Sequence, residues 1–176
     1  MQFSNHTIRL ITKTDREKLF SLIDRNRSRL EDFFAGTVSK TKTLADTYNF
    51  VDEVLQRIDD KQYYSFLIIN NDSSDIVGYI DVKNIDWNIP KAEFGCYFDT
   101  EHCRKGLATE AMNIVISKLF NKEGFNKLFL RTHKENTAAR KLAEKCGFEV
   151  EGIIRNDYKK TNGEIVDLVY YGLVKE

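Results

Sequence analysis

The sequence predicts an α/β fold in which helices cover both faces of a mixed β-sheet. Segments with alternating, β-branched or aromatic strand patterns are interspersed with segments whose apolar residues recur at helical spacing. Their order is strand, three helices, three strands, helix, strand, helix and two strands. No linker, repeat or low-complexity tract divides them, so residues 1–176 are expected to form a single domain.

The first quarter of the chain is expected to hold a strand at residues 7–12 followed by helices. Capping boxes at residues 14–17 and 28–31 predict two helix starts, and the second helix is short and ends near Gly36. A longer amphipathic helix is predicted to start at Thr43. Its core-facing stripe is expected to be Leu44, Tyr48, Val51, Leu55 and Ile58.

Three strands are then predicted at residues 63–69, 76–82 and 92–98. The third strand is expected to place Ala92, Phe94, Cys96 and Phe98 on one face and Glu93, Gly95 and Tyr97 on the other. Further elements are expected as a strand at 127–132, a helix at 136–146 ended by Gly147, and an antiparallel pair at 148–155 and 165–174.

Residues 100–120 combine a loop with the start of a helix that opens near Gly106 and is closed by Gly124. The first N–H groups of a helix lack internal partners, and the helix dipole adds positive potential there. Gly106 has no Cβ to hinder a ligand, and Arg104 and Lys105 place two cations beside these donors. The combination suits a diphosphate, although an ordinary strand–loop–helix connection has the same outline. Neither GxxxxGK[S/T] nor GxGxxG occurs, so the nucleotide-hydrolase and dinucleotide fingerprints are absent.

Composition limits the function classes. Lys plus Arg number 27 and Asp plus Glu number 27, so no overall field recruits nucleic acid or an anionic membrane. No signal-peptide pattern and no apolar segment of membrane-spanning length is found. Cys96, Cys103 and Cys146 are odd in number, far apart and without zinc-ligand spacing, which predicts a cytoplasmic protein with no metal site.

Two segments, CRKGLATEA and NTAARKLAEKCGFEVEG, together with the element order, resemble the GNAT acyl-coenzyme A N-acyltransferases. The family's loop is written Q/R-x-x-G-x-G/A, and Cys103, Gly106 and Ala108 occupy its positions. Asn136, before a short helix ending in Gly147, matches the second signature. Within the family the chain is most similar to the ribosomal-protein N-terminal acetyltransferases of the RimJ/RimL type. The resemblance implies a mostly antiparallel sheet with a splayed parallel central strand pair.

The resemblance also implies which residues bind acetyl-CoA. Loop N–H groups would hold its pyrophosphate, the third strand would bond its pantetheine arm, and Asn136 would bond the pantetheine or its waters. The residues assigned to the coenzyme are Cys96, Tyr97, Phe98, Cys103, Arg104, Lys105, Gly106, Leu107, Ala108, Thr109 and Asn136.

Acetyl transfer to an amine requires a proton acceptor and a donor for the developing oxyanion. Glu93 is the candidate base, with a solvated strand carboxylate as its alternative, and the strand at Tyr97 is the candidate oxyanion donor. Acids and bases known from relatives are replaced here by Arg131, Ala139 and Ala143. Glu93, Tyr97, Asp157 or Tyr158 would substitute for them, or proximity would carry the catalysis. The three histidines, His6, His102 and His133, are expected to be structural or exposed.

The resemblance predicts an acetyl-CoA-dependent N-acetyltransferase that acts on a primary amine. The acceptor is expected to be a protein N-terminus, or else a small molecule such as a polyamine, aminoglycoside or amino-sugar. A third hypothesis is a module that binds acyl-CoA without transferring it. Nucleic acid and membrane are not expected as partners, and a homodimer is among the expected states because relatives are often dimers.

Overall fold

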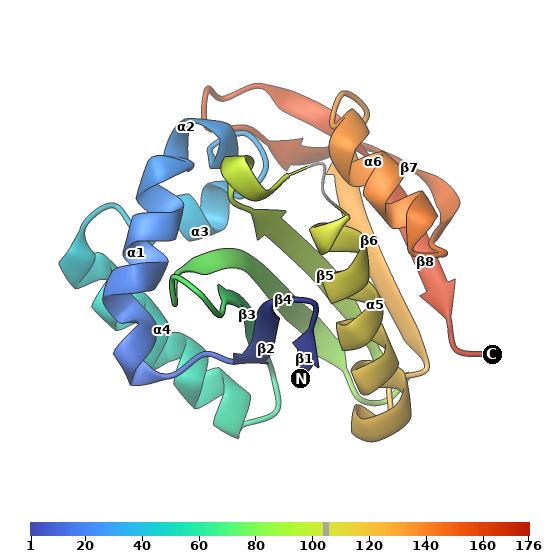
Figure 1. The fold of residues 1–176 in the computed structure, drawn as a ribbon. Coiled ribbons are helices and arrows are strands. Elements are labelled where there is room, and N and C mark those ends of the chain that lie inside the picture. Colours follow the sequence, from blue (N-terminus) through green and yellow to red (C-terminus); the bar gives the residue numbers. More distant parts are fainter. Residues whose placement is uncertain (104–105) are drawn as a thin grey trace.

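The computed structural model describes residues 1–103 and 106–176, and its eight strands form one sheet (Figure 1). The strand order is β1-β2-β3-β4-β5-β6-β8-β7. The strands are β1 (Gln2–Phe3), β2 (His6–Leu10), β3 (Tyr64–Asn70), β4 (Ile76–Asp86), β5 (Lys91–Phe98), β6 (Lys127–His133), β7 (Glu149–Lys159) and β8 (Ile165–Val174). All neighbours are antiparallel except β5 and β6, which run parallel. The predicted mixed sheet with a parallel central pair is therefore confirmed.

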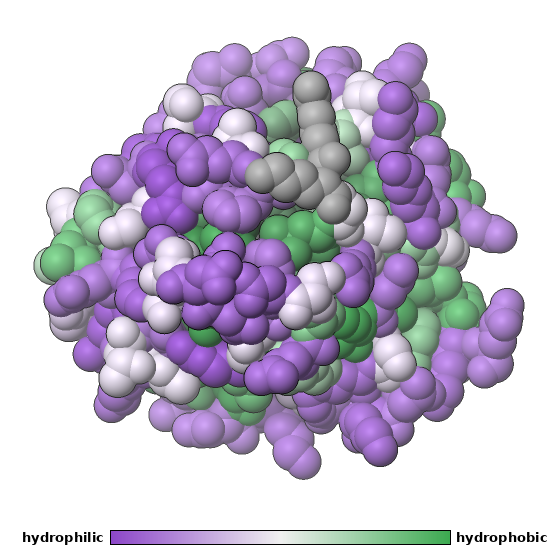
Figure 2. Space-filling model, viewed as in Figure 1, coloured by the Kyte–Doolittle hydropathy of each residue, from purple (hydrophilic) through white to green (hydrophobic). Residues whose placement is uncertain are grey.

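Helices cover both faces of the sheet, as predicted. The helices are α1 (Arg16–Arg25), α2 (Arg27–Leu30), α3 (Ala35–Ser39), α4 (Leu44–Asp59), α5 (Leu107–Lys118) and α6 (Thr137–Lys145). In Figure 1, α1 and α4 lie together on one side of the sheet and α5 and α6 on the other. Figure 2 shows mostly hydrophilic residues over the same view, with hydrophobic residues grouped toward its middle.

The core is divided by the sheet into two hydrophobic clusters. One joins Leu22 of α1 and Val51 of α4 to Leu67, Tyr79 and Tyr97 of the sheet. The other joins the α5 and α6 side to the opposite sheet face through Met112, Val115, Ile80, Phe94, Leu128 and Phe148. Because neighbouring strand residues point to opposite faces, Phe94 and Tyr97 of β5 belong to different clusters. The predicted division of this strand into two faces is confirmed.

Helix boundaries in the first quarter differ from the predicted ones. The first capping box is formed by Thr12 and Asp15 at a short 3-10 turn (Lys13–Asp15), and α1 follows at Arg16. The second helix begins at Arg27 and ends at Leu30, so Phe33 lies beyond it. The expected box at 28–31 is wrong because the chain turns after Leu30 and starts a separate helix, α3, that contains Gly36.

The α4 helix begins at Thr43 as predicted, with the Thr43 hydroxyl accepting from Asp46 N–H. Its buried face is rotated from the predicted stripe, because Leu44 and Tyr48 are exposed while Phe50 and Val54 are buried. Both sets recur at helical spacing, so the sequence pattern alone does not distinguish them. Packing against α1 and β3 decides which face is covered.

Candidate active site

The parallel strands β5 and β6 separate before either strand ends. Their register pairs run from Lys91 opposite Lys127 to Glu93 opposite Phe129, whereas β4 stays paired with β5 as far as Phe98. Within the described residues, the β6-facing backbone edge of residues 94–98 therefore has no strand partner. Backbone N–H and C=O groups require partners, so this edge is suited to an extended ligand that bonds like a strand.

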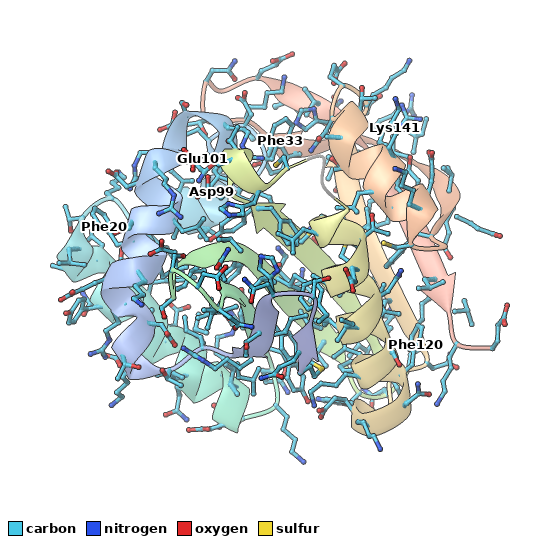
Figure 3. All side chains as sticks on the ribbon, viewed as in Figure 1. Phe20, Phe33, Asp99, Glu101, Phe120 and Lys141 are labelled. Atoms are coloured by element: carbon cyan, nitrogen blue, oxygen red, sulfur yellow. The ribbon has the colours of Figure 1, made fainter. Side chains whose placement is uncertain are left out.

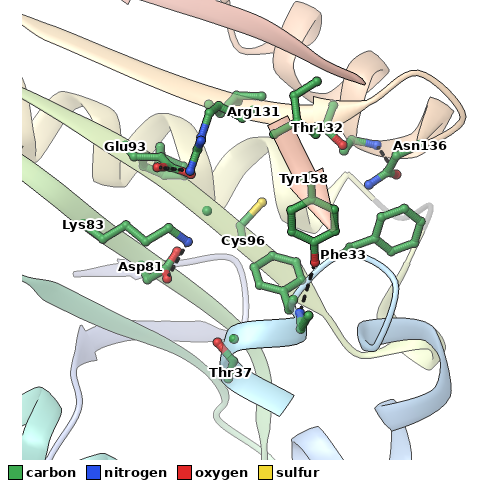
Figure 4. A pocket seen from close by; sticks show the side chains of 18 of the residues that line it. Phe33, Thr37, Asp81, Lys83, Glu93, Cys96, Arg131, Thr132, Asn136 and Tyr158 are labelled. Carbon is green, nitrogen blue, oxygen red and sulfur yellow. Dashed lines mark hydrogen bonds and ion pairs between the residues drawn. The ribbon is translucent and has the colours of Figure 1, made fainter. Parts of the chain in front are cut away.

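A cavity of about 400 Å³ lies where the two strands separate (Figure 4). Its walls come from the open part of β5, the end of β6, the start of α6 and the chain between α2 and α3. Residues that line it include Phe33, Ala35, Asp81, Lys83, Glu93, Gly95, Cys96, Arg131, His133, Asn136 and Tyr158. Of the predicted coenzyme and catalytic residues, this cavity brings together Glu93, Cys96 and Asn136.

The start of α5 forms the second part of the predicted coenzyme site. Gly106 is the helix N-cap and has a φ of 80°, in the left-handed region that favours glycine. A Cβ at this position would meet no atom within 4 Å, so the glycine is explained by its backbone conformation rather than by crowding. Leu107 anchors the first turn in the core, and Thr109 lies in that turn. The predicted roles of Arg104 and Lys105 fall outside the described residues.

The N-terminus of α6 is closed by Asn136, whose Oδ1 accepts from Ala139 N–H at 3.2 Å. No hydrogen bond joins its Nδ2 to another described residue, so this amide nitrogen is left to donate to a ligand. The glycine predicted to end the helix, Gly147, has a φ of 84° and follows the last turn. The second signature segment therefore adopts the expected helix, with its capping side chain at the cavity wall.

A hydrogen-bond network that sequence reasoning missed ties α1 and α2 to the segment after β5. Asn26 is buried between the two helices, and its Oδ1 accepts from both the hydroxyl and the N–H of Thr100 at 2.9 and 3.2 Å. Arg25 forms an ion pair with Asp99 at 2.5 Å. Asp99 is labelled in Figure 3, close to Glu101. Burial alone would raise the pKa of Asp99, but the bonds and charge of Arg25 and the bond from Asn26 outweigh it and lower this pKa. The network fixes the start of the loop that precedes α5.

Glu93 is buried rather than solvated, with 7% of its surface exposed. Its Oε2 accepts from Asn84 Nδ2 at 2.6 Å and from Arg131 Nη2 at 3.0 Å. Arg131 also donates to Asp157 and Tyr170, each at 3.2 Å. Oε1 of Glu93 forms no hydrogen bond with another described residue, so this oxygen is free to accept a hydrogen bond from the substrate amine. The alternative of a solvated strand carboxylate is therefore wrong.

A second buried carboxylate, Asp81, lies on the neighbouring strand opposite Gly95. Its Oδ2 accepts from the Tyr63 hydroxyl at 2.9 Å and from Lys83 Nζ at 3.2 Å. A Cβ at position 95 would clash with Asp81 Oδ1, so the glycine makes room for this oxygen. Burial alone would lower the pKa of Lys83, but the charges of Asp81 and Glu93 outweigh it and raise this pKa. No local pattern marks Asp81, because its importance comes from its cross-strand position.

The side chain of Tyr97 points into the helix-covered cluster on the α1 and α4 side. Its ring stacks on Tyr79 at 5.1 Å and meets the Phe34 ring edge-on at 5.0 Å. Burial, with the charges of Tyr79 and Asp81, raises the pKa of the Tyr97 phenol well above its usual value. A hydroxyl held there is a poor proton donor, so the geometry leaves Tyr97 a role through its strand backbone.

The imidazole of His133 is buried and forms part of the cavity wall, so of the two expected states, structural and exposed, the exposed one is wrong. Its ring stacks on Phe33 at 4.6 Å and lies nearly parallel to Tyr158 at 6.5 Å. The Tyr158 hydroxyl accepts from Ala35 N–H at 3.3 Å and so joins β7 to the start of α3. These contacts close the cavity on the side of the chain between α2 and α3 (Figure 4).

Within residues 1–103 and 106–176, no group of three or more His, Cys, Asp or Glu side chains is placed to hold a metal ion. Over the same ranges, every helix is too short or too polar to cross a membrane. Cys96, Cys103 and Cys146 are free thiols.

Comparison with known proteins identifies the family to which this arrangement belongs. The sequence profile of the acetyltransferase (GNAT) domain matches residues 6–149. A proposed ribosomal N-acetyltransferase of Bacillus subtilis (strain 168), YdaF, is 32% identical over 171 residues, which cover 96% of this chain and 91% of YdaF. The spermidine N(1)-acetyltransferase of Vibrio cholerae is 24% identical, over 88% of this chain and 85% of its own. The structure of RimL, a ribosomal L7/L12 acetyltransferase in complex with coenzyme A, superposes with a TM-score of 0.90 at 14% identity, over 98% of this chain and 95% of RimL.

The chain belongs to the GNAT acetyltransferase family, and it shares its fold with RimL. It is therefore an N-acetyltransferase, and enzymes of this family use acetyl-CoA. The relatives include both ribosomal-protein and spermidine acetyltransferases, so membership in the family establishes acetyl transfer but not the class of acceptor.

Proposed function

We propose that residues 1–176 act as one cytoplasmic domain that transfers the acetyl group of acetyl-CoA to the primary amine of a protein N-terminus. The observation that carries the proposal is the open edge of β5, where residues 94–98 lack a strand partner beside a cavity lined by Asn136. An extended pantetheine arm suits this edge in length and in hydrogen-bonding pattern. The free thiols support the cytoplasmic assignment.

The coenzyme is assigned to two adjoining surfaces. The pantetheine arm is proposed to bond the backbone of Cys96, Tyr97 and Phe98 and to reach Asn136. Its pyrophosphate is proposed to bind at the segment from Cys103 to Thr109, where the first N–H groups of α5 are unpaired within the helix. This places the thioester beside Glu93 and Gly95, near the buried end of the cavity.

Acceptor chemistry is proposed to occur on the face of the sheet that carries Glu93. A primary amine with a pKa of about 8 to 10 is mostly protonated at neutral pH, so it must lose a proton before it attacks the thioester. The free oxygen of Glu93 is proposed to bond the amine, and a backbone N–H near Tyr97 to bond the oxyanion. Once a base has taken the first proton, the amine forms the C–N bond and the C–S bond breaks, and the second proton lost from the nitrogen goes to the thiolate, so that the coenzyme leaves as a thiol.

A thiol-release assay tests the proposal. We expect acetyl-CoA to yield free coenzyme A thiol in the presence of peptides with a free N-terminus, and intact-mass measurement to show one acetyl group added to the peptide. Glu93→Gln is expected to slow turnover while leaving coenzyme binding intact, because the exchange keeps the shape and removes the charge.

The second candidate acceptor is a small amine, favoured by the similarity to spermidine N(1)-acetyltransferase. Spermidine, an aminoglycoside and an amino-sugar therefore accompany the peptides in the assay. If the enzyme acetylates one of these small amines faster than every peptide, the proposed protein acceptor is wrong and the acceptor is a small molecule. Stabilisation by coenzyme A without thiol release for any amine would instead indicate a binding module and overturn the proposed transfer.

A further inference from the structure

We infer that His133, held by Glu135, is the proton acceptor for the amine in this active site. The inference rests on the proposed function, since it assigns a residue to the reaction proposed for the same cavity. It fills the position left open by Arg131, Ala139 and Ala143, which replace the acids and bases that the resemblance leads one to expect.

The two ring nitrogens of His133 have different environments. Nδ1 lies 3.3 Å from Oε2 of Glu135, a distance at which the carboxylate accepts a hydrogen bond from Nδ1–H. Nε2 is buried and has no hydrogen-bond partner within the described residues. A carboxylate at one nitrogen selects the tautomer in which the other nitrogen carries the lone pair. Nε2 is therefore the basic atom, and it belongs to a residue of the cavity wall.

The unpaired nitrogen itself indicates a ligand. Leaving a buried polar atom without a partner costs free energy that a hydrogen bond would recover. The ring is held by stacking on Phe33 at 4.6 Å and by the parallel ring of Tyr158, so it is fixed in orientation rather than free to turn toward solvent. An amine or a water molecule in the cavity supplies the missing partner for Nε2.

Position along β6 brings this nitrogen close to the rest of the site. His133 follows Arg131 by two residues, so both side chains lie on the same sheet face. Arg131 in turn is bonded to Glu93 at 3.0 Å, on the strand whose open edge is proposed to hold the thioester. Glu93 and His133 both line the cavity that is proposed to hold the acceptor amine.

The charged and titratable groups around the ring come from several elements. Arg131 shares its strand, Glu135 bonds its Nδ1, and Tyr158 of β7 lies against its face beside Asp157. The pKa of Glu135 is lowered chiefly by hydrogen bonds, first from its own backbone and then from His133. The positive charge of Lys160 lowers it further. Among residues 1–103 and 106–176, Glu135 is the one carboxylate that bonds the imidazole.

The proposed step balances in protons and electrons. Nε2 takes one proton from the ammonium form of the acceptor, and the resulting imidazolium is stabilised by Glu135. The neutral amine attacks the thioester carbon, the C–N bond forms and the C–S bond breaks. The second proton lost from the nitrogen goes to the coenzyme thiolate, and His133 returns the first to solvent.

The test compares His133→Gln with the unchanged enzyme, using acetyl-CoA and the best acceptor from the panel above. General acid–base catalysis contributes about 10²- to 10⁴-fold, so we expect kcat to fall at least about 100-fold with the KM for acetyl-CoA within about twofold. The acidic limb of the kcat/KM profile should disappear. In His133→Ala, added imidazole should restore part of the rate, because the slot between Phe33 and Tyr158 is vacated.

The Glu135→Gln variant tests whether Glu135 and His133 act together in the reaction or whether His133 is only structural. Loss of the carboxylate removes the charge that stabilises the imidazolium, so kcat should fall while the KM for acetyl-CoA stays within about twofold. Imidazole nitrogen shifts measured by NMR report the tautomer of His133 in both proteins without any acceptor. His6→Gln is the matched control, since His6 stacks on Phe3 outside the cavity, and it should change nothing.

The outcomes distinguish the inference from the proposed function. Unchanged rate and pH profile in His133→Gln, with thiol release by the unchanged enzyme, would overturn the inference alone. An unchanged kcat in Glu135→Gln, together with an unchanged His133 tautomer, would do so as well. Absence of thiol release by the unchanged enzyme across the panel would overturn the proposed function, and the inference with it.

Discussion

At the scale of single residues, Gly106 has a left-handed backbone conformation on which the proposed coenzyme site depends. The left-handed φ of 80° turns the chain so that the first N–H groups of α5 face outward from the helix end. Gly124 closes the same structural unit with a φ of 83° after the π-helical turn that continues α5 (Leu119–Glu123). An added Cβ would meet no atom within 4 Å at either position. The two glycines thus lie at opposite ends of this helical segment, but both have a left-handed φ and both have open space around the Cβ position.

Their similarity gives a matched pair of substitutions. Gly106→Val and Gly124→Val should each reduce stability by at least about 1–2 kcal/mol, because a left-handed conformation is strained for any residue with a Cβ. Only Gly106→Val should also weaken coenzyme A binding, measured by titration calorimetry. Equal coenzyme affinity in the two variants would show that the start of α5 is not the pyrophosphate site.

Cysteine labelling tests the placement of Cys103 beside the coenzyme. Burial, followed by the charges of Cys146 and Asp81, raises the pKa of Cys96 to about 12, and burial raises that of Cys146 to about 11. At pH 8 their thiolate fractions are only about 10⁻⁴ and 10⁻³, and the thiolate is the reactive form. Cys103, which is partly exposed, should therefore react first with iodoacetamide, and coenzyme A should protect it. Peptide mapping with equal labelling of all three cysteines would contradict this.

At the scale of elements, the contact between the α1–α2 junction and the end of β5 couples two sides of the site. The Asn26 side chain is buried and bonds Thr100, while Arg25 pairs with Asp99. Helices that cover the acceptor side therefore determine where the loop toward α5 begins. Neither helix would be assigned to coenzyme binding from its own sequence.

Asn26→Ala is expected to weaken this coupling. It leaves the Thr100 hydroxyl and N–H without their protein acceptor, and because Thr100 is exposed and water can take the place of Asn26, each lost bond costs about 0.5–1.5 kcal/mol. The KM for acetyl-CoA should rise several-fold while the KM for the amine changes little, in steady-state kinetics at saturating second substrate. Asn49→Ala, on an exposed part of α4, is the control. A larger effect on the amine KM would place the network on the acceptor side instead.

The ion pair of Asp99 predicts the response of this junction to acid. Its pKa is lowered from 3.8, so its contribution to stability is fully present above pH 3.8 and is lost as pH falls through the lowered value. Arg25→Ala removes the main lowering partner and should shift that loss to higher pH. Acid unfolding followed by circular dichroism measures the difference between the two proteins. Identical acid transitions would show that the pair does not contribute.

At the scale of the whole molecule, the parallel contact of β5 with β6 joins two parts of the sheet. Beyond its three register pairs the strands diverge, and the cavity occupies the space between them. A coenzyme bonded along the open edge would connect these parts through backbone hydrogen bonds. Ligand binding should therefore stabilise the fold as well as fill the site.

Hydrogen exchange measures this effect directly. Coenzyme A at 100 times its Kd should raise the free energy of unfolding by about 2.7 kcal/mol. Protection should increase most for the amides of residues 94–98 and of the first turn of α5. The amides of β2 and β3, far from the cavity, serve as the internal control. Unchanged exchange at residues 94–98 would contradict seating of the pantetheine arm on β5.

The division between predictable and unpredictable features follows from the range of the interactions. Strand faces, the Thr43 cap of α4, the Asn136 cap of α6 and the left-handed glycines depend on residues a few positions apart, so local patterns reveal them. The rotated face of α4 and the break between α2 and α3 were wrongly predicted because packing partners elsewhere in the chain decide them. The same limit applies to the buried state of Glu93, which depends on Arg131 and Asn84.

The sequence by itself determined the order of the elements, the class of fold and the segments proposed to hold the coenzyme, because each has a compact local pattern. Only the tertiary structure decided the composition of the acceptor side of the cavity, where Phe33, Asp81, Glu93, Arg131, His133 and Tyr158 meet. Those residues come from four strands and one loop, and their relation is one of register and packing between distant segments. Side chains brought together in that way carry no common signal along the chain, so their chemistry emerges only when the sheet is assembled.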